Sequence, residues 1–233
     1  MGSPFHIILI DEDSAKASAI ARSCFQMVDS FNRLFSDYDT TSELSKLNAQ
    51  AGKHPVKISS GLWDMIQLSK KAYQLSKGVF DITVAPLSSV WRKARKYNQF
   101  PDENLLKSTR RWIGFSKLVL DSLEHSVYLP FKGMRLDLGG IAKGYTAEKL
   151  VRFIQSRGIQ KCLVDAGGDM VMGEAAANSG GWTIGVNIPE TTDELLPDKL
   201  QLQNKAVATS GDAYQYIAHN GKKYSHIINP LTG

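Results

Sequence analysis

The feature that most constrains the fold is a glycine-rich turn, DLGGIAKGY, at residues 137–145. An apolar, strand-like run leads into this turn, and a helical pattern that ends at Gly158 follows it. The next run, CLVDAGGD, has the pattern of a strand that ends in a second glycine turn at 166–169. Because glycines let a backbone turn tightly, these segments predict a strand–turn–helix–strand unit.

The rest of the chain mixes helical and strand patterns without a regular alternation of the two. Helices are predicted at 14–36, 60–76 and 101–108, a strand at 5–10, a hairpin at 117–130, and a terminal hairpin around Asn220-Gly221. This order favours an α+β fold over a doubly wound sheet. With 42% hydrophobic and 22% charged residues, the 233-residue chain fits a soluble globular protein with a real core.

Charge and cysteine content narrow the classes of ligand. The net charge is +5, and the densest basic cluster, WRKARKY at 91–97, is interpreted as a solvated segment. No nucleic-acid-binding module is visible, so a nucleic-acid partner is not expected, whereas a small anionic ligand suits the mild positive charge. Cys24 and Cys162 lack metal-site spacing and are expected to be buried thiols, with a disulfide left open.

The turn itself could hold a phosphate or a pyrophosphate. Gly139 and Gly140 leave backbone N–H groups unobstructed, the helix start adds partial positive charge, and Lys143 adds a full one. Asp137 could accept hydrogen bonds from a ribose or a ring N–H. The spacing matches neither the dinucleotide fingerprint nor the Walker loop, and a glycine pair alone is more often only a tight turn. The second glycine turn favours a shared ligand cleft.

Three other residues each allow two interpretations. Tyr38, in the polar segment SDYDTTSEL, is either an ordinary exposed loop tyrosine or a platform for a flat heterocycle. Asp81, in GVFDIT, is either a turn cap or a binding residue. His226 is either a base near a phosphate site or a packed strand histidine.

Five segments, taken in order, carry a specific resemblance. They are MGSPF, FSDYDTTSELSKLN, GVFDITVAPL, DLGGIAKGYTAEKL with CLVDAGGDM, and ATSGDAYQYIAHNGKKYSHIINPLTG. Together they cover almost the whole chain, which resembles the FAD:protein FMN transferase family of ApbE-like flavin transferases. The resemblance implies one domain over residues 1–233, with an α+β fold of the T-fold type, mixed sheets, packed helices and an FAD cleft.

The resemblance also implies a reaction. Members of the family transfer FMN from FAD to a threonine or serine hydroxyl of an acceptor flavoprotein, in a magnesium-dependent step that forms a phosphoester and releases AMP. The implied acceptor is a subunit of a respiratory sodium pump or a related redox protein. The implied location is the bacterial periplasm or the outer face of the inner membrane, with room for a lipid anchor outside the given chain. Two alternatives stay open: an FAD pyrophosphatase giving FMN and AMP, and a non-catalytic FAD-binding module.

Roles follow for the residues that match the family motifs. Contacts with FAD are implied for Met1, Tyr38, Val79, Phe80, Asp81, Asp137, Lys143 and Ile228. The carbonyl of Gly140 is implied as a magnesium ligand, and His226 as the base that activates the acceptor hydroxyl. Relatives continue beyond NPLTG with an Asp-Ala-x-x-Thr pattern that supplies the main magnesium ligands. The given chain is therefore expected to lack the family's C-terminal strand and helix.

Overall fold

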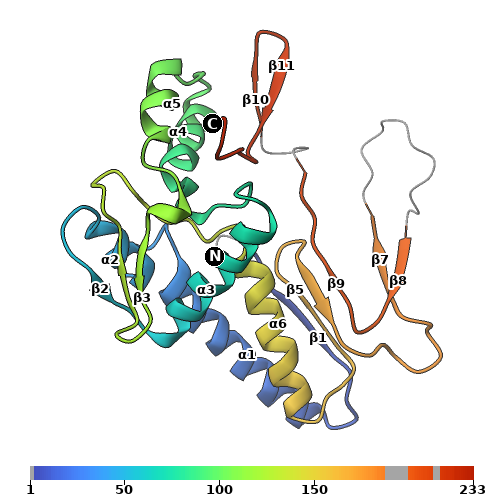
Figure 1. Ribbon diagram of the computed structural model, residues 1–233. Helices are drawn as coiled ribbons and strands as arrows, with labels where there is room; N and C mark the ends of the chain where they lie inside the picture. The colour runs from blue at the N-terminus through green and yellow to red at the C-terminus, as the bar shows by residue number, and fades with distance from the viewer. Residues whose placement is uncertain (1–2, 187–198, 212–215) are drawn as a thin grey trace. The chain divides into compact units, whose positions relative to one another are not determined.

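The computed structural model describes residues 3–186, 199–211 and 216–233 (Figure 1). Within these residues, helices combine with short strands in four small sheets whose strand pairs are all antiparallel. The predicted α+β class, with several sheets and packed helices, is confirmed.

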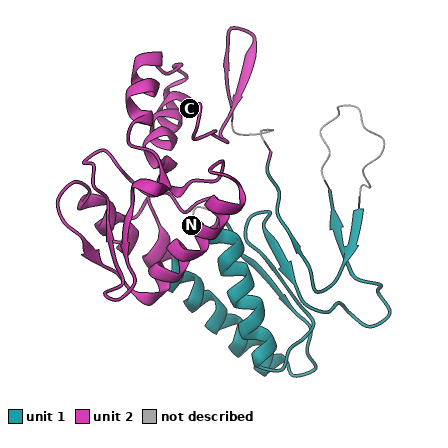
Figure 2. Cartoon of the chain, viewed as in Figure 1, with its two compact units in different colours: residues 1–31, 142–210 teal, residues 32–141, 211–233 magenta. Residues whose placement is uncertain are grey.

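The chain divides into two compact units, each made from two stretches of sequence (Figure 2). Unit 1 comprises residues 1–31 and 142–210, and unit 2 comprises residues 32–141 and 211–233. The single domain over 1–233 stays a prediction. Met1, a predicted FAD contact, lies outside the described residues.

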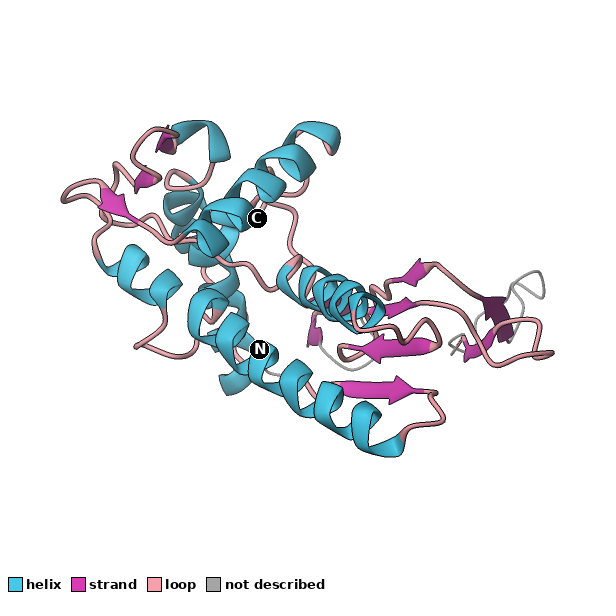
Figure 3. Ribbon diagram, turned by 90° about the horizontal axis from the view of Figure 1, so that it is seen from below, coloured by secondary structure: helices cyan, strands magenta, loops and turns pink. Residues whose placement is uncertain are grey.

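Unit 1 is built on a four-stranded sheet in the order β1-β5-β6-β9. Its elements are β1 (His6–Leu9), α1 (Ser14–Phe35), α6 (Ala142–Ser156), β5 (Cys162–Asp165), β6 (Met170–Met172), β7 (Trp182–Gly185), β8 (Lys199–Leu202) and β9 (Ala206–Val207). Helices α1 and α6 run beside this sheet (Figure 3), and their apolar side chains share a core with it.

The two faces of the sheet bury different side chains of the same strand. Cys162 and Val164 join the core formed with α1 and α6, whereas Leu163 joins a second cluster with the β7–β8 hairpin. This is the two-residue period of a strand covered on both faces. The uninterrupted apolar run CLV in the sequence follows from that double burial.

Both cysteines are free and fully buried, as predicted, in the core beneath α1. Burial, together with the neighbouring Cys162, raises the pKa of the Cys24 thiol to about 11. At pH 8 only about one Cys24 in a thousand would then be thiolate, and the thiolate is the reactive form. We expect a disulfide-exchange reagent to leave both thiols unmodified in the native protein and to titrate both after unfolding in guanidinium. Rapid modification of the native protein would contradict this core.

Unit 2 combines helices with a three-stranded sheet, β2-β4-β3, and a two-stranded hairpin. Its elements are α2 (Glu43–Ala49), β2 (Val56–Lys57), α3 (Ser60–Leu75), the 3₁₀ turns η1 (Ile82–Val84) and η2 (Phe115–Lys117), α4 (Ala85–Tyr97), α5 (Glu103–Arg110), β3 (Val119–Asp121), β4 (Ser126–Tyr128), β10 (Tyr216–His219) and β11 (Lys222–Ser225). The predicted terminal hairpin is confirmed, with Asn220 (φ 49°) and Gly221 (φ 74°) both left-handed in the turn.

Two sequence-based expectations were wrong. The apolar run before DLGG is not a strand, because the side chain of Asn48 takes the place of a neighbouring strand. Its Oδ1 accepts from Leu136 N (2.7 Å) and its Nδ2 donates to Leu136 O (3.0 Å). The basic cluster WRKARKY is not merely a solvated segment. It forms the second half of α4, with Trp91 and Ala94 buried.

Candidate functional site

Arg92, on α4, organises a polar cluster in unit 2. Its Nη1 donates to Asp37 Oδ2 at 2.6 Å, and its Nη2 donates to Asp137 Oδ2 at 2.6 Å. Its guanidinium also lies 4.8 Å from the centre of the Tyr38 ring. One side chain therefore connects two predicted site residues, Tyr38 and Asp137, that stand about a hundred positions apart in the sequence.

The charges in this cluster perturb one another. Burial raises the pKa of Asp137 above its usual range, and the negative charge of Asp37 adds to the rise, while the Gly139 N–H and Arg92 oppose it. Burial alone would lower the pKa of Arg92, but the hydrogen bond to Asp37 and the charges of both carboxylates outweigh it and raise the pKa. The two carboxylates thus depend on this one shared cation.

The turn that carries Asp137 lies against the segment 80–82. Asp137 N donates to Ile82 O at 2.7 Å, and Asp137 Oδ1 accepts from Gly139 N at 2.8 Å. A Cβ added at Gly140 would stand 3.3 Å from Phe80 Cε2. Neither glycine of this pair has a positive φ. Gly140 is therefore explained by the close approach of Phe80, and not by a backbone conformation that only glycine adopts.

Asp81 caps a turn, which is the structural interpretation left open by the sequence. Its Oδ1 accepts from Thr83 N (2.8 Å) and Thr83 Oγ1 (2.6 Å), and its Oδ2 accepts from Phe115 N (2.9 Å). The residue is buried, at 7% exposure. Both carboxylate oxygens are thus committed to the fold. A contact of this segment with FAD stays a prediction, as it does for Val79, whose side chain is exposed.

Replacing Asp81 by alanine should destabilise the protein by about 3 kcal/mol, because three buried donors would lose their acceptor. Urea unfolding followed by circular dichroism measures the loss. A natural control is Asp39, which accepts from Thr41 N and Thr41 Oγ1 with the same spacing, but near solvent. We expect Asp39→Ala to cost much less. Equal losses would show that burial does not decide the cost.

His226 and Ile228 lie just after β11, in unit 2. The turn is held by Ile227 N, which donates to Ser225 Oγ at 3.0 Å. The Nδ1 atom of His226 is buried, and none of the described residues forms a hydrogen bond with it. Ile228 packs against a cluster that includes Trp91 and Ile217. The helix α4 thus contacts the segment of the predicted base through Trp91 and carries Arg92 toward Asp137.

Lys143 belongs to unit 1, where its Nζ pairs with Asp169 Oδ2 at 3.1 Å. Asp169 ends the second glycine turn, whose Gly167 (φ 67°) and Gly168 (φ 94°) are both left-handed. Here the glycines are required by conformation. Asp165 Oδ1 accepts from Gly168 N at 2.7 Å and fixes the turn. The shared cleft of the two glycine turns stays a prediction.

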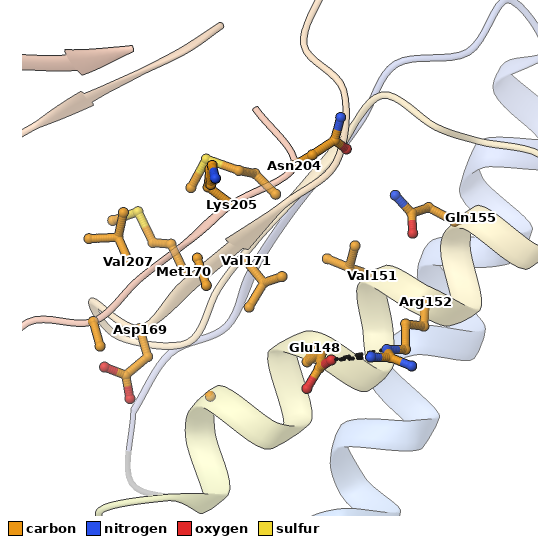
Figure 4. A pocket seen from close by; sticks show the side chains of 14 residues that line it. Glu148, Val151, Arg152, Gln155, Asp169, Met170, Val171, Asn204, Lys205 and Val207 are labelled. Carbon is orange, nitrogen blue, oxygen red and sulfur yellow. Dashed lines mark hydrogen bonds and ion pairs between the residues drawn. The ribbon is translucent and has the colours of Figure 1, made fainter. Parts of the chain in front are cut away.

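Unit 1 also contains a cavity of about 680 Å³ between α6 and the strands β6 and β9 (Figure 4). Its walls mix apolar side chains such as Val151 and Val171 with the ion pair Glu148–Arg152, whose shortest distance is 2.6 Å. None of the residues predicted to contact FAD lines it. The cavity is therefore not assigned to the nucleotide.

The described residues do not by themselves fit a magnesium site. No group of three or more His, Cys, Asp or Glu side chains among them is arranged to hold a metal ion. Asp137 has its two oxygens engaged by Arg92 and by Gly139 N. The predicted carbonyl ligand at Gly140 would need other oxygen ligands to complete the six-coordinate shell that magnesium demands. No chemical step is therefore derived through the ion.

Small antiparallel sheets with packed helices, and a polar cluster assembled from the motif segments, define an α+β protein with a candidate ligand site. The chain belongs to the ApbE family, whose model matches residues 1–233.

Two curated relatives are both FAD:protein FMN transferases. The one from Klebsiella pneumoniae (strain 342) is 31% identical over 234 residues, covering 100% of this chain and 71% of the relative. The one from Treponema pallidum (strain Nichols) is 28% identical over 233 residues, covering 94% of this chain and 64% of the relative. Each relative is thus named as an enzyme.

Solved structures show the same fold. The ApbE protein of Thermotoga maritima matches with a TM-score of 0.87 at 27% identity, covering 99% of this chain and 74% of that one. A mutant of the flavin transferase ApbE from Vibrio cholerae matches with a TM-score of 0.85 at 25% identity, covering 100% of this chain and 74% of that one.

Proposed function

We propose that this protein transfers FMN from FAD to a hydroxyl group of an acceptor protein. One observation carries the proposal: in a member of the ApbE family, three motif segments far apart in sequence bring Tyr38, Phe80, Asp137 and Gly140 together in unit 2. An exposed aromatic ring suits a flat heterocycle, and a glycine turn with little side-chain bulk suits a diphosphate.

The chemistry is a phosphoryl transfer whose atoms balance without an oxidant. The acceptor hydroxyl oxygen attacks the phosphorus of the FMN half of FAD, and a new phosphoester bond forms. The bond from that phosphorus to the bridging oxygen breaks, and AMP leaves with the oxygen. His226 is the proposed acceptor of the hydroxyl proton. Such transfers depend on positioning and charge neutralisation more than on covalent help, and Lys143 is the proposed cation.

The finer points of the proposal rest on the family resemblance. They are a threonine or serine as the modified residue, a requirement for magnesium, and a respiratory sodium-pump subunit or related redox protein as acceptor. The periplasm or outer face of the inner membrane is the proposed location. Within the described part of the chain, no helix is long and apolar enough to cross a bilayer.

The test is an incubation of the full chain with FAD, magnesium and a sodium-pump flavoprotein subunit, followed by a denaturing gel viewed by flavin fluorescence. We expect a fluorescent acceptor band, no band when the acceptor threonine is replaced by alanine, and no band when EDTA removes magnesium. Free FMN and AMP without a labelled acceptor would favour the pyrophosphatase alternative. Tight FAD binding without turnover would favour a binding module.

A further inference from the structure

Arg95 is a second arginine on the face of α4 that carries Arg92. The two residues are three positions apart, a spacing that makes them neighbours on a helix surface. The carboxylates of Asp37 and Asp137 both pair with Arg92. The Nη1 atom of Arg95 is buried, and no described residue accepts a hydrogen bond from it.

This arrangement is unfavourable for the protein alone. Burial, and then the positive charge of Arg92, lower the pKa of Arg95. A buried donor without an acceptor costs stability, and a cation beside another cation costs more. Nearly all buried polar groups in native proteins are hydrogen-bonded, so an exception requires an explanation. Stability given up at one position is a common sign of a binding function there.

The surroundings indicate what Arg95 would bind. Tyr38 is 70% exposed, and the guanidinium of Arg92 lies 4.8 Å from its ring centre. Arg95 lies on the same face of α4 as Arg92, less than one helical turn further along. An aromatic platform beside an unpaired guanidinium suits a ligand with a flat ring and an oxyanion. The rigid donor fork of arginine favours phosphate oxygens.

We propose that Arg95 is a binding residue of this site, and that its buried amino group donates a hydrogen bond to a phosphate oxygen of the dinucleotide. The proposal rests on the proposed function, since it takes FAD as the ligand. It gives α4 two separate tasks. Arg92 holds Asp37 and Asp137 in place, whereas Arg95 contacts the ligand directly.

The experiment compares the full-length wild type with Arg95→Gln and with Lys93→Gln, which removes the same charge from an exposed position of the same helix. FAD affinity is measured by quenching of flavin fluorescence, and inorganic pyrophosphate is added as a competitor. Thermal unfolding is recorded for all three proteins. We expect Arg95→Gln to weaken FAD binding about 10- to 100-fold, the range for one charge-assisted hydrogen bond. Pyrophosphate should compete less well with FAD on this variant.

Stability separates a binding role from a structural one. Because Arg95 has an unpaired buried donor, Arg95→Gln should unfold at the same temperature as the wild type or higher. The inference is overturned if the variant binds FAD as the wild type does, if Lys93→Gln loses as much affinity, if pyrophosphate competition is unchanged, or if the melting temperature falls. A wild type that does not bind FAD would instead overturn the proposed function itself.

Discussion

Replacing His226 by alanine is expected to slow FMN transfer by about 100- to 10,000-fold, the usual contribution of a positioned general base. FAD affinity should stay unchanged, because the proposed role of the ring is to take the proton of the acceptor hydroxyl. Single-turnover rates at saturating FAD and acceptor measure the effect. The Nδ1 atom of His226 is buried, whereas the residue as a whole is half-buried, so part of the ring can still be reached from solvent.

The split between rate and affinity distinguishes a base from a packing residue. If His226 takes the proton, the variant should lose rate at saturating FAD and acceptor while its FAD affinity stays at the wild-type value. His54, an exposed histidine of unit 2, provides the control, and His54→Ala should leave the rate unchanged. A His226→Ala rate within threefold of the wild type, or a loss explained wholly by weaker FAD binding, would refute the assignment.

Replacing Arg92 by glutamine is expected to destabilise the protein by about 2 kcal/mol at neutral pH and to weaken FAD binding. The change leaves Asp37 and Asp137 near each other without their shared cation. The loss is modest because the Arg92 side chain is about one-third exposed and solvent screens its charge. Urea unfolding at a series of pH values measures the stability.

The sign of the pH effect follows from Asp137. Burial and Asp37 already raise the pKa of Asp137, and loss of Arg92 should raise it further. A carboxylate whose pKa is raised by folding destabilises the native state as pH rises through that pKa. The deficit of Arg92→Gln should therefore be largest at neutral pH and should shrink in acid, where Asp137 is protonated. Arg92→Lys keeps the positive charge but lacks the planar pair of donor groups that reaches both carboxylates. Its free energy of unfolding should lie between those of the wild type and Arg92→Gln. A loss of stability that grew on acidification would contradict the proposed role of Arg92 as the shared partner of Asp37 and Asp137.

Periodic patterns in the sequence predicted most helices and hairpins, because those patterns are local. The helix from Ser14 and the turn at Asn220-Gly221 depend on spacing and on left-handed conformations that a sequence displays directly. The run before DLGG was mistaken for a strand because its hydrogen-bond partner is a side chain, Asn48, 88 positions away in the chain. No local pattern contains that pairing.

The candidate site was predicted in part. The motif resemblance indicated Tyr38 and Asp137. Because WRKARKY was interpreted as a solvated segment from its charge, Arg92 was not predicted as a site residue. A signal was present, because Ser88, Arg92 and Arg95 follow the spacing i, i+4 and i+7 of one helix face. That face could not be assigned a partner without knowing that Asp37 and Asp137 lie opposite it. The ion pairs of Arg92 join residues far apart in the chain, and such pairs produce no periodic pattern in the sequence.

The central claim is that FAD is split by this protein and that its FMN half ends on another protein. The most direct measurement counts AMP released and FMN bound covalently to the acceptor in the same reaction, by chromatography and by intact-protein mass spectrometry. The account predicts equal amounts of the two, with the added mass lost when the acceptor hydroxyl is removed. AMP accompanied by an equal amount of free FMN, and an acceptor of unchanged mass, would contradict it.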